Sequence, residues 1–161
     1  MPKPMVIEEN MVRKVLPIIP ETPDEIAAYI REATNYVAYI EDRWLTRLVF
    51  DKDTLKDKIS AIQAGVEIRR NKYIGANFDE IPKELRKTAT SIAQFVDYNV
   101  NRDETLQANE NLRDYKRQLS DIRNKITAWK TAKEQYERSI QSSTMVLAWA
   151  KASLKLGGSN Y

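Results

Sequence analysis

A short basic and aromatic cluster contains the residue types of this sequence that are best suited to binding chemistry. Arg69, Arg70, Lys72 and Tyr73 lie within five residues, and Gly75 follows them. Cationic side chains neutralise phosphates and release counterions, while a flat ring can stack on an unpaired base. The cluster therefore predicts a nucleic-acid-binding site. The structural alternative is a helix end where cations offset the negative C-terminal dipole.

A second basic and aromatic stretch lies upstream, where Arg43 and Arg47 flank Trp44. We add the two arginines to the predicted nucleic-acid-binding residues. Trp44 itself occupies an apolar position in a helical pattern, so we expect its ring in the core rather than on a base.

The charge of the chain is unevenly distributed along its length. The 161 residues include 26 Lys and Arg against 23 Asp and Glu, a formal net charge of +3. Residues 111–161 contribute 10 basic and 4 acidic side chains, whereas residues 76–110 contribute 4 and 7. This asymmetry favours a polyanionic partner or a contact between oppositely charged segments of two subunits; a solvated Lys-rich helix is the alternative.

The missing residue types argue against an enzyme. The chain has no Cys and no His, which excludes zinc fingers, Ser-His-Asp triads and disulfides. Asp51, Asp53 and Asp57 lack the Gly and the terminal Glu of a calcium loop. We expect no metal and no cofactor. No apolar run approaches the ~20 residues of a membrane span, and we expect a cytoplasmic protein.

Apolar residues recur three or four positions apart and predict an all-α protein. The sequence Thr22-Pro23-Asp24-Glu25 resembles a capping box at the start of the first helix. Asp51 or Asp53 is expected to cap the second helix. We expect an extended Pro-rich arm over residues 1–20 and a tail over residues 157–161. The expected helices of the single domain between them, residues 21–156, cover about residues 22–50, 53–74, 82–99 and 103–156.

The last of these helices has the most regular spacing. From Leu112 to Leu154 the pattern alternates between intervals of three and four, which is the spacing of a coiled coil. Lys133 and Ser143 interrupt it, as polar residues that fix register do. Shorter helices cannot cover a helix of about 50 residues along its whole length. We therefore expect self-association as a homo-oligomer, or a break near Ser142. The residues assigned to oligomerisation are Leu112, Tyr115, Leu119, Ile122, Ile126, Trp129, Tyr136 and Ile140.

Three stretches of the chain resemble the UvsY-type phage recombination mediators. The stretch from Asn35 to Arg47, with Trp44-Leu45 inside it, is similar to the family's Asn-x-x-x-x-Tyr and Lys-Trp-Leu-x-Lys region. The stretch from Glu67 to Gly75 resembles the family's basic helix, which closes in Tyr-x-Gly. Asp103-Glu-Thr-Leu106 resembles the start of its last helix. Together the matches span about residues 33–140.

The resemblance implies a non-enzymatic accessory protein of phage recombination and repair. Such proteins bind single-stranded DNA, form ring-like homo-oligomers and help load a RecA-like recombinase in place of single-strand-binding protein. The resemblance places DNA binding on Arg69, Arg70, Lys72 and Tyr73. Glu67 departs from the pattern, because a family member carries Lys there.

Two other functions fit the same sequence. A structural helical subunit of a virion or filament would use the predicted heptad pattern and latch a neighbour with the Pro-rich arm. A coiled-coil adaptor would bind a protein partner through Lys116, Arg123 and Lys130, which flank the apolar positions. Binding to single-stranded DNA would separate the first function from both of these.

Overall fold

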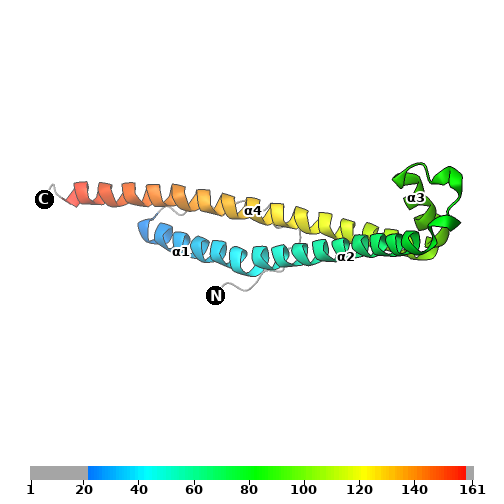
Figure 1. The fold of residues 1–161 in the computed structure, drawn as a ribbon. Helices are drawn as coiled ribbons and strands as arrows, with labels where there is room; N and C mark the ends of the chain where they lie inside the picture. Colours follow the sequence, from blue (N-terminus) through cyan, green and yellow to red (C-terminus); the bar gives the residue numbers. More distant parts are fainter. Residues whose placement is uncertain (1–21, 159–161) are drawn as a thin grey trace. The chain divides into compact units, whose positions relative to one another are not determined.

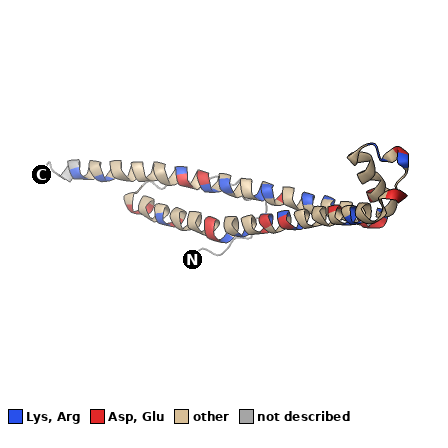
Figure 2. Cartoon of the chain, viewed as in Figure 1, with Lys and Arg blue, Asp and Glu red and all other residues tan. Residues whose placement is uncertain are grey.

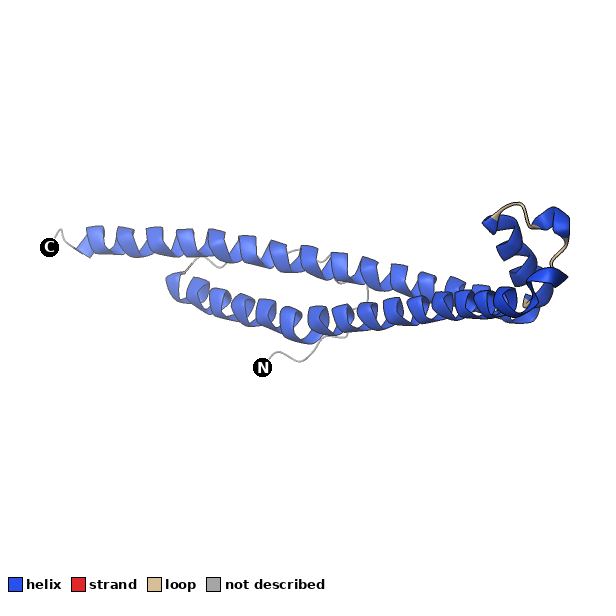
Figure 3. Ribbon diagram, viewed as in Figure 1, coloured by secondary structure: helices blue, strands red, loops and turns tan. Residues whose placement is uncertain are grey.

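The computed structural model describes residues 22–158, with side chains through Lys155, as an all-helical chain (Figures 1 and 3). No described residue lies in a strand, which confirms the predicted all-α class. The predicted arm at residues 1–20 lies outside the described residues. The helical elements are α1 (Pro23–Tyr39), η2 (Ile40–Leu45), α2 (Thr46–Asn77), η3 (Phe78–Glu80), η4 (Lys83–Leu85), α3 (Ala89–Phe95), η5 (Val96–Val100) and α4 (Arg102–Gly158).

The first helix begins where the sequence predicts. Thr22 is the N-cap residue of α1 and Pro23 is its first helical residue. The predicted capping box is wrong, because the Thr22 side chain makes no cap hydrogen bond. The Thr22 carbonyl instead accepts the Ile26 N–H at 2.9 Å, so the backbone alone closes the first turn.

The predicted break near Asp51 and Asp53 is also wrong. Both residues lie inside α2, which follows α1 through the π-helical turn η2 and ends at Asn77, two residues after Gly75. A cap bond contributes about 1 kcal/mol. Stopping the helix there would interrupt the face on which Leu55 and Ile59 are buried, and burying two such side chains stabilises by more.

The predicted helix over residues 82–99 is shorter than expected. The structure begins α3 at Ala89, where the Thr88 hydroxyl accepts the Ser91 N–H at 3.1 Å and caps the helix. The preceding loop is held by Arg86, which donates to the carbonyls of Ile81 and Asp79 at 2.8 and 2.6 Å. The start of α3 is therefore fixed by the Thr88 hydroxyl cap and not, as the sequence predicted, by Pro82.

The last helix is continuous. α4 passes through Ser142 and Ser143 without a break and includes Gly157 and Gly158, which the sequence assigned to a tail. Ser143 is fully buried within this unbroken helix rather than at a hinge.

The described residues form two compact units, and the first consists of residues 22–50 and 123–158. Here α1, η2 and the start of α2 run antiparallel to the C-terminal part of α4. The Tyr29 and Ser139 hydroxyls share a hydrogen bond of 2.7 Å, and Trp44 stacks on Trp129. The buried apolar residues of this unit are Ile26, Tyr29, Ala33, Ile40, Leu45, Ile126, Trp129 and Ala132.

The second unit consists of residues 51–122. Most of α2 packs here against the N-terminal part of α4, and α3 and η5 complete the unit. Leu55, Ile59 and Leu119 form a buried cluster, and partly buried Leu112, Tyr115 and Ile122 pack against it.

Candidate nucleic-acid interface

Arg70, a predicted phosphate contact, is held by an acidic partner in the second unit. Its Nη2 and Nε donate to the two carboxylate oxygens of Asp97 at 2.6 and 3.0 Å, a bidentate pair. Asp97 lies in η5 and is buried, with 8% of its surface exposed. The hydrogen bond to Asp97 raises the already high pKa of Arg70, and burial opposes it. While this pair is intact, Arg70 is not available to a phosphate.

Tyr73, the predicted stacking residue, is also engaged. Its hydroxyl donates to the Glu80 carboxylate at 3.4 Å, and the ring is half-buried. Burial, followed by the nearby Glu80 charge, raises the pKa of Tyr73. A base would have to displace this contact in order to stack on the ring.

Arg69 and Lys72 differ from their neighbours because both are exposed. Neither makes a hydrogen bond or an ion pair within the described part of the chain. They are three residues apart on α2, so their side chains are neighbours on the helix surface. The Arg69 guanidinium lies back over Gly65, where an added Cβ would be 3.7 Å from its Nη1. These two cations are the part of the predicted cluster that can meet a phosphate.

Arg43 and Arg47 are exposed too, but they belong to the first unit. Between them, Trp44 packs inward on Trp129, with ring centroids 5.2 Å apart and an interplanar angle of 12°. The Trp44 Nε1 is buried without a hydrogen-bond partner in the described structure. The Trp44 ring thus packs against the core residue Trp129, and Trp44 itself is half-buried.

The eight residues assigned to oligomerisation have partners inside the chain or lie next to such residues. In the second unit, Leu112, Tyr115, Leu119 and Ile122 belong to the cluster around Leu55 and Ile59. In the first, Trp129 stacks on Trp44, and Tyr136 contacts Tyr36 with ring centroids 4.9 Å apart. The remaining two, Ile126 and Ile140, are buried and half-buried on the same helix. Most of these residues of α4 therefore pack against other helices of the same chain, and their assignment to oligomerisation stays a prediction.

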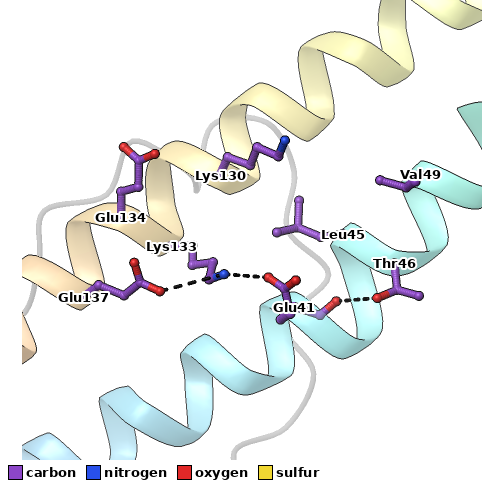
Figure 4. Close-up of a pocket in the computed structure, with 8 residues that line it drawn as sticks. All are labelled: Glu41, Leu45, Thr46, Val49, Lys130, Lys133, Glu134 and Glu137. Atoms are coloured by element: carbon purple, nitrogen blue, oxygen red, sulfur yellow. Dashed lines mark hydrogen bonds and ion pairs between the residues drawn. The ribbon is translucent and has the colours of Figure 1, made fainter.

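A shallow pocket in the first unit was not anticipated from the sequence (Figure 4). Its volume is about 550 Å³. Lys133, one of the polar interruptions of the predicted heptad pattern, donates to Glu41 at 2.7 Å across the helix pair and lies 3.8 Å from Glu137. The hydrogen bond to Glu41 raises the pKa of Lys133. The lining residues are Glu41, Leu45, Thr46, Val49, Lys130, Lys133, Glu134 and Glu137.

The pocket is lined by side chains of both charges, and its carboxylates do not form a cluster apart from the lysines. Three acidic and two basic side chains line it, and Lys133 holds two of the acids together. Such a surface does not favour a polyanion. A lysine within an apolar helical pattern was the signal for this contact, although its partner 92 positions away could not be identified from spacing alone.

Within residues 22–158, no group of three or more acidic side chains is placed to hold a metal ion. None of the described helices combines the length and the apolar character needed to cross a membrane. Comparison with known proteins found no matching family model, no matching curated protein and no matching solved structure.

Proposed function

We propose that this chain is a non-enzymatic, single-stranded DNA-binding protein that helps load a RecA-like recombinase during phage recombination and repair, in place of single-strand-binding protein. The resemblance of residues 35–47 and 67–75 to UvsY-type mediators supports the pathway. The observation that carries DNA binding is the exposed pair Arg69 and Lys72, which has no acidic partner in the described structure. The cytoplasm of the infected cell is the corresponding location.

The proposed interface is smaller than the sequence suggested. Arg69 and Lys72 neutralise phosphates, whereas Arg70 is paired with Asp97 and the Tyr73 hydroxyl donates to Glu80. Arg43 and Arg47 form a separate exposed pair on the first unit and provide a second point of backbone contact. Since these contacts are to phosphates, binding should show little sequence preference and strong salt dependence.

The test is a salt titration of binding to a labelled oligonucleotide, followed by fluorescence anisotropy. Each phosphate contact on a single strand contributes about 0.7 to the slope of log K against log salt. Replacing both cations with glutamate (Arg69→Glu with Lys72→Glu) should lower the slope by about 1.4 and weaken binding. The matched control is Lys83→Glu with Lys87→Glu, which makes the same charge change at exposed residues of the same unit.

The proposal fails if the natural chain does not bind single-stranded DNA at about 50 mM salt, where phosphate contacts are strongest. The assignment of DNA binding to Arg69 and Lys72 fails if both double variants lower the salt slope equally. Circular dichroism of each variant separates lost binding from lost folding.

The proposed homo-oligomer, a ring in the family's manner, needs a surface other than the face of α4 that packs within the chain. Exposed apolar side chains gather near the end of α4, where Met145 is 66%, Val146 47% and Trp149 77% exposed. An exposed patch of this kind is typical of a protein–protein contact. We assign self-association to this outer face. Trp149→Asp should then reduce the mass measured by light scattering, and an unchanged mass would contradict the assignment.

The same outer face favours a second candidate function, a structural subunit or a coiled-coil adaptor. This candidate requires assembly, or a protein partner, without affinity for DNA. Light scattering with and without a single-stranded oligonucleotide distinguishes the candidates, because only the DNA-binding protein forms a complex of higher mass when the oligonucleotide is added.

A further inference from the structure

Gly65 lies in the interior of α2, and nothing in the described fold requires a glycine at this position. A glycine in a helix interior is less favourable than alanine, because it loses more conformational freedom on folding. Its φ is not positive. A Cβ added at Gly65 would meet only Nη1 of Arg69, at 3.7 Å, which is an ordinary contact with a flexible side chain. The remaining use of a glycine is the close approach of another molecule to the helix backbone.

Exposed cations lie on both sides of Gly65 on the same face of α2. Lys58 precedes it and Lys72 follows it by seven residues each, so both lie within about 20° of Gly65 around the helix axis. Arg69 follows Gly65 by four residues and lies about 40° away. All three cationic side chains are exposed. They form a straight row that extends for about 21 Å along the helix, at 1.5 Å per residue.

Lys58 makes no ion pair with a described acidic residue. Its Nζ lies 5.6 Å from the centroid of the Tyr115 ring of α4, which is a cation–π distance. The ring takes up one side of the ammonium group and leaves N–H donors on the other side for a phosphate. Asp114, the residue before Tyr115, lies 3.9 Å from Arg117. Lys58 therefore keeps an uncompensated positive charge on the face that contains Gly65.

Both basic and acidic residues occur along α2 (Figure 2), so the side of the helix that each occupies decides whether the row is neutralised. Asp57 lies about 100° from Lys58 around the axis, and Glu67 lies about 180° from it. Asp51, seven residues before Lys58, is on the same side and marks the end of the cationic face. From Lys58 to Lys72, no acidic side chain of α2 lies on the face of the row.

We propose that the bound DNA strand runs along α2 over Gly65, and that Lys58 is a third phosphate contact of the same site. The absent side chain at Gly65 lets the sugar–phosphate backbone lie against the helix between Lys58 on one side and Arg69 and Lys72 on the other. This contact rests on the proposed DNA binding by Arg69 and Lys72. It adds a residue that the basic and aromatic cluster does not include, and it gives the strand a direction along the helix.

A pair of lysine variants tests the third phosphate contact. Lys58→Gln removes the charge on the row. The matched control, Lys56→Gln, removes the charge of another exposed lysine of α2, about 160° away around the helix. Binding to a labelled single-stranded oligonucleotide is measured by fluorescence anisotropy over a range of salt concentrations. Lys58→Gln should lower the salt slope by about 0.7 and weaken binding about fivefold at about 0.1 M salt, whereas Lys56→Gln should change neither.

A second pair of variants tests the close approach at Gly65. Gly65→Leu places a side chain in the path of the strand, and the matched control Ala64→Leu places the same side chain at an exposed position about 100° away. Leucine is a better helix former than glycine, so Gly65→Leu should raise the melting temperature. It should nevertheless weaken DNA binding about fivefold at about 0.1 M salt, as the loss of one phosphate contact does. Ala64→Leu should bind as the natural chain does.

Two results would overturn the contact while leaving the proposed function intact. One is an equal salt slope for Lys58→Gln and Lys56→Gln, and the other is unchanged binding by Gly65→Leu, each with normal binding by the natural chain. Failure of the natural chain to bind the oligonucleotide would overturn the proposed function and this contact together. A Gly65→Leu variant that is more stable and binds DNA more weakly supports the contact, because a purely structural role of Gly65 would lower stability as well.

Discussion

The two described π-helical turns place their key side chains against different kinds of partner. In η2, Trp44 stacks on Trp129 of α4 with ring centroids 5.2 Å apart. In η5, Asp97 accepts two hydrogen bonds from Arg70 of α2, the shorter at 2.6 Å. The first unit is thus fastened by an apolar aromatic contact and the second by an ion pair.

This difference shows that the same local deviation from the α-helix can serve packing of either type. A π turn inserts one extra residue and turns a side chain toward a neighbouring helix. Aromatic burial is non-directional and tolerates small shifts of the rings. A bidentate Arg–carboxylate pair requires fixed geometry, and removing one partner leaves the other charge without its counterion. Each unit should therefore depend on its own type of contact.

The largest effect is expected from Trp129→Ala in the first unit. Trp129 is 5% exposed, and its removal leaves a large cavity beside Trp44. Such truncations cost about 3–5 kcal/mol in the free energy of unfolding, which urea denaturation followed by circular dichroism measures. Trp149→Ala is the matched control on the same helix. Because Trp149 is 77% exposed, its loss should change stability by less than about 0.5 kcal/mol. Similar losses in both variants would show that the stack does not fasten the first unit.

A smaller effect is expected from Asp97→Ala in the second unit. Removing one partner of a buried pair costs about 3–5 kcal/mol. The Arg70 side chain is 28% exposed and can be partly hydrated, so we expect about 2 kcal/mol in the urea midpoint analysis.

The double variant Arg70→Met with Asp97→Leu separates charge from shape. An apolar pair of similar volume often restores the stability that a broken ion pair loses. Recovery of most of the loss supports an ionic fastening of the second unit. A double variant no more stable than Asp97→Ala would instead indicate that the geometry of η5, rather than its charge, is required.

The smallest effect is an alkaline loss of stability that should fall mainly on the first unit. Burial raises the pKa of Tyr36 and of Tyr136 above 10.0, so the folded state favours the neutral phenols. Their contribution is complete below pH 10.0 and is lost as the pH rises through the raised values. The hydrogen bond to Asp97 raises the already high pKa of Arg70, so this side chain keeps its charge throughout this range.

Thermal denaturation at pH 9 and at about pH 11 measures this loss. Tyr136→Phe should reduce the difference between the two melting temperatures, because one titrating phenol is gone, while changing stability at neutral pH by less than about 1 kcal/mol. An unchanged difference would mean that other groups carry the alkaline loss. The first unit would then be no more sensitive to alkaline pH than the second unit.

The sequence predicts the apolar faces of this fold well because those faces depend on local spacing. Leu112, Tyr115, Leu119 and Ile122 do pack with Leu55 and Ile59, and Thr22-Pro23 does begin α1. Boundaries were less predictable. Asp51 and Asp53 have the side chains of cap residues, yet both lie inside α2. The apolar surface that the longer helix buries stabilises the fold by more than a cap hydrogen bond would.

The candidate site was only partly predictable, because charge pairing depends on contacts distant in the sequence. Arg69 and Arg70 are adjacent, yet one is exposed and the other is bound to Asp97, 27 residues away. Nothing in the spacing of the cluster distinguishes them. The π turn that brings Asp97 into place is likewise formed by residues, Val96–Val100, that would also suit an α-helix.

The turn η2 also sets the rotation of α1 about its axis relative to α2. An α-helix turns about 100° per residue. Because a π turn closes its hydrogen bonds over one more residue than an α turn, it absorbs an extra residue. If Ile40–Leu45 adopted regular α geometry at the same length, all of α1 would rotate by about that angle against the start of α2. Ile26, Tyr29 and Ala33 would leave the core together. The π geometry of this turn therefore keeps the buried face of α1 directed at α4.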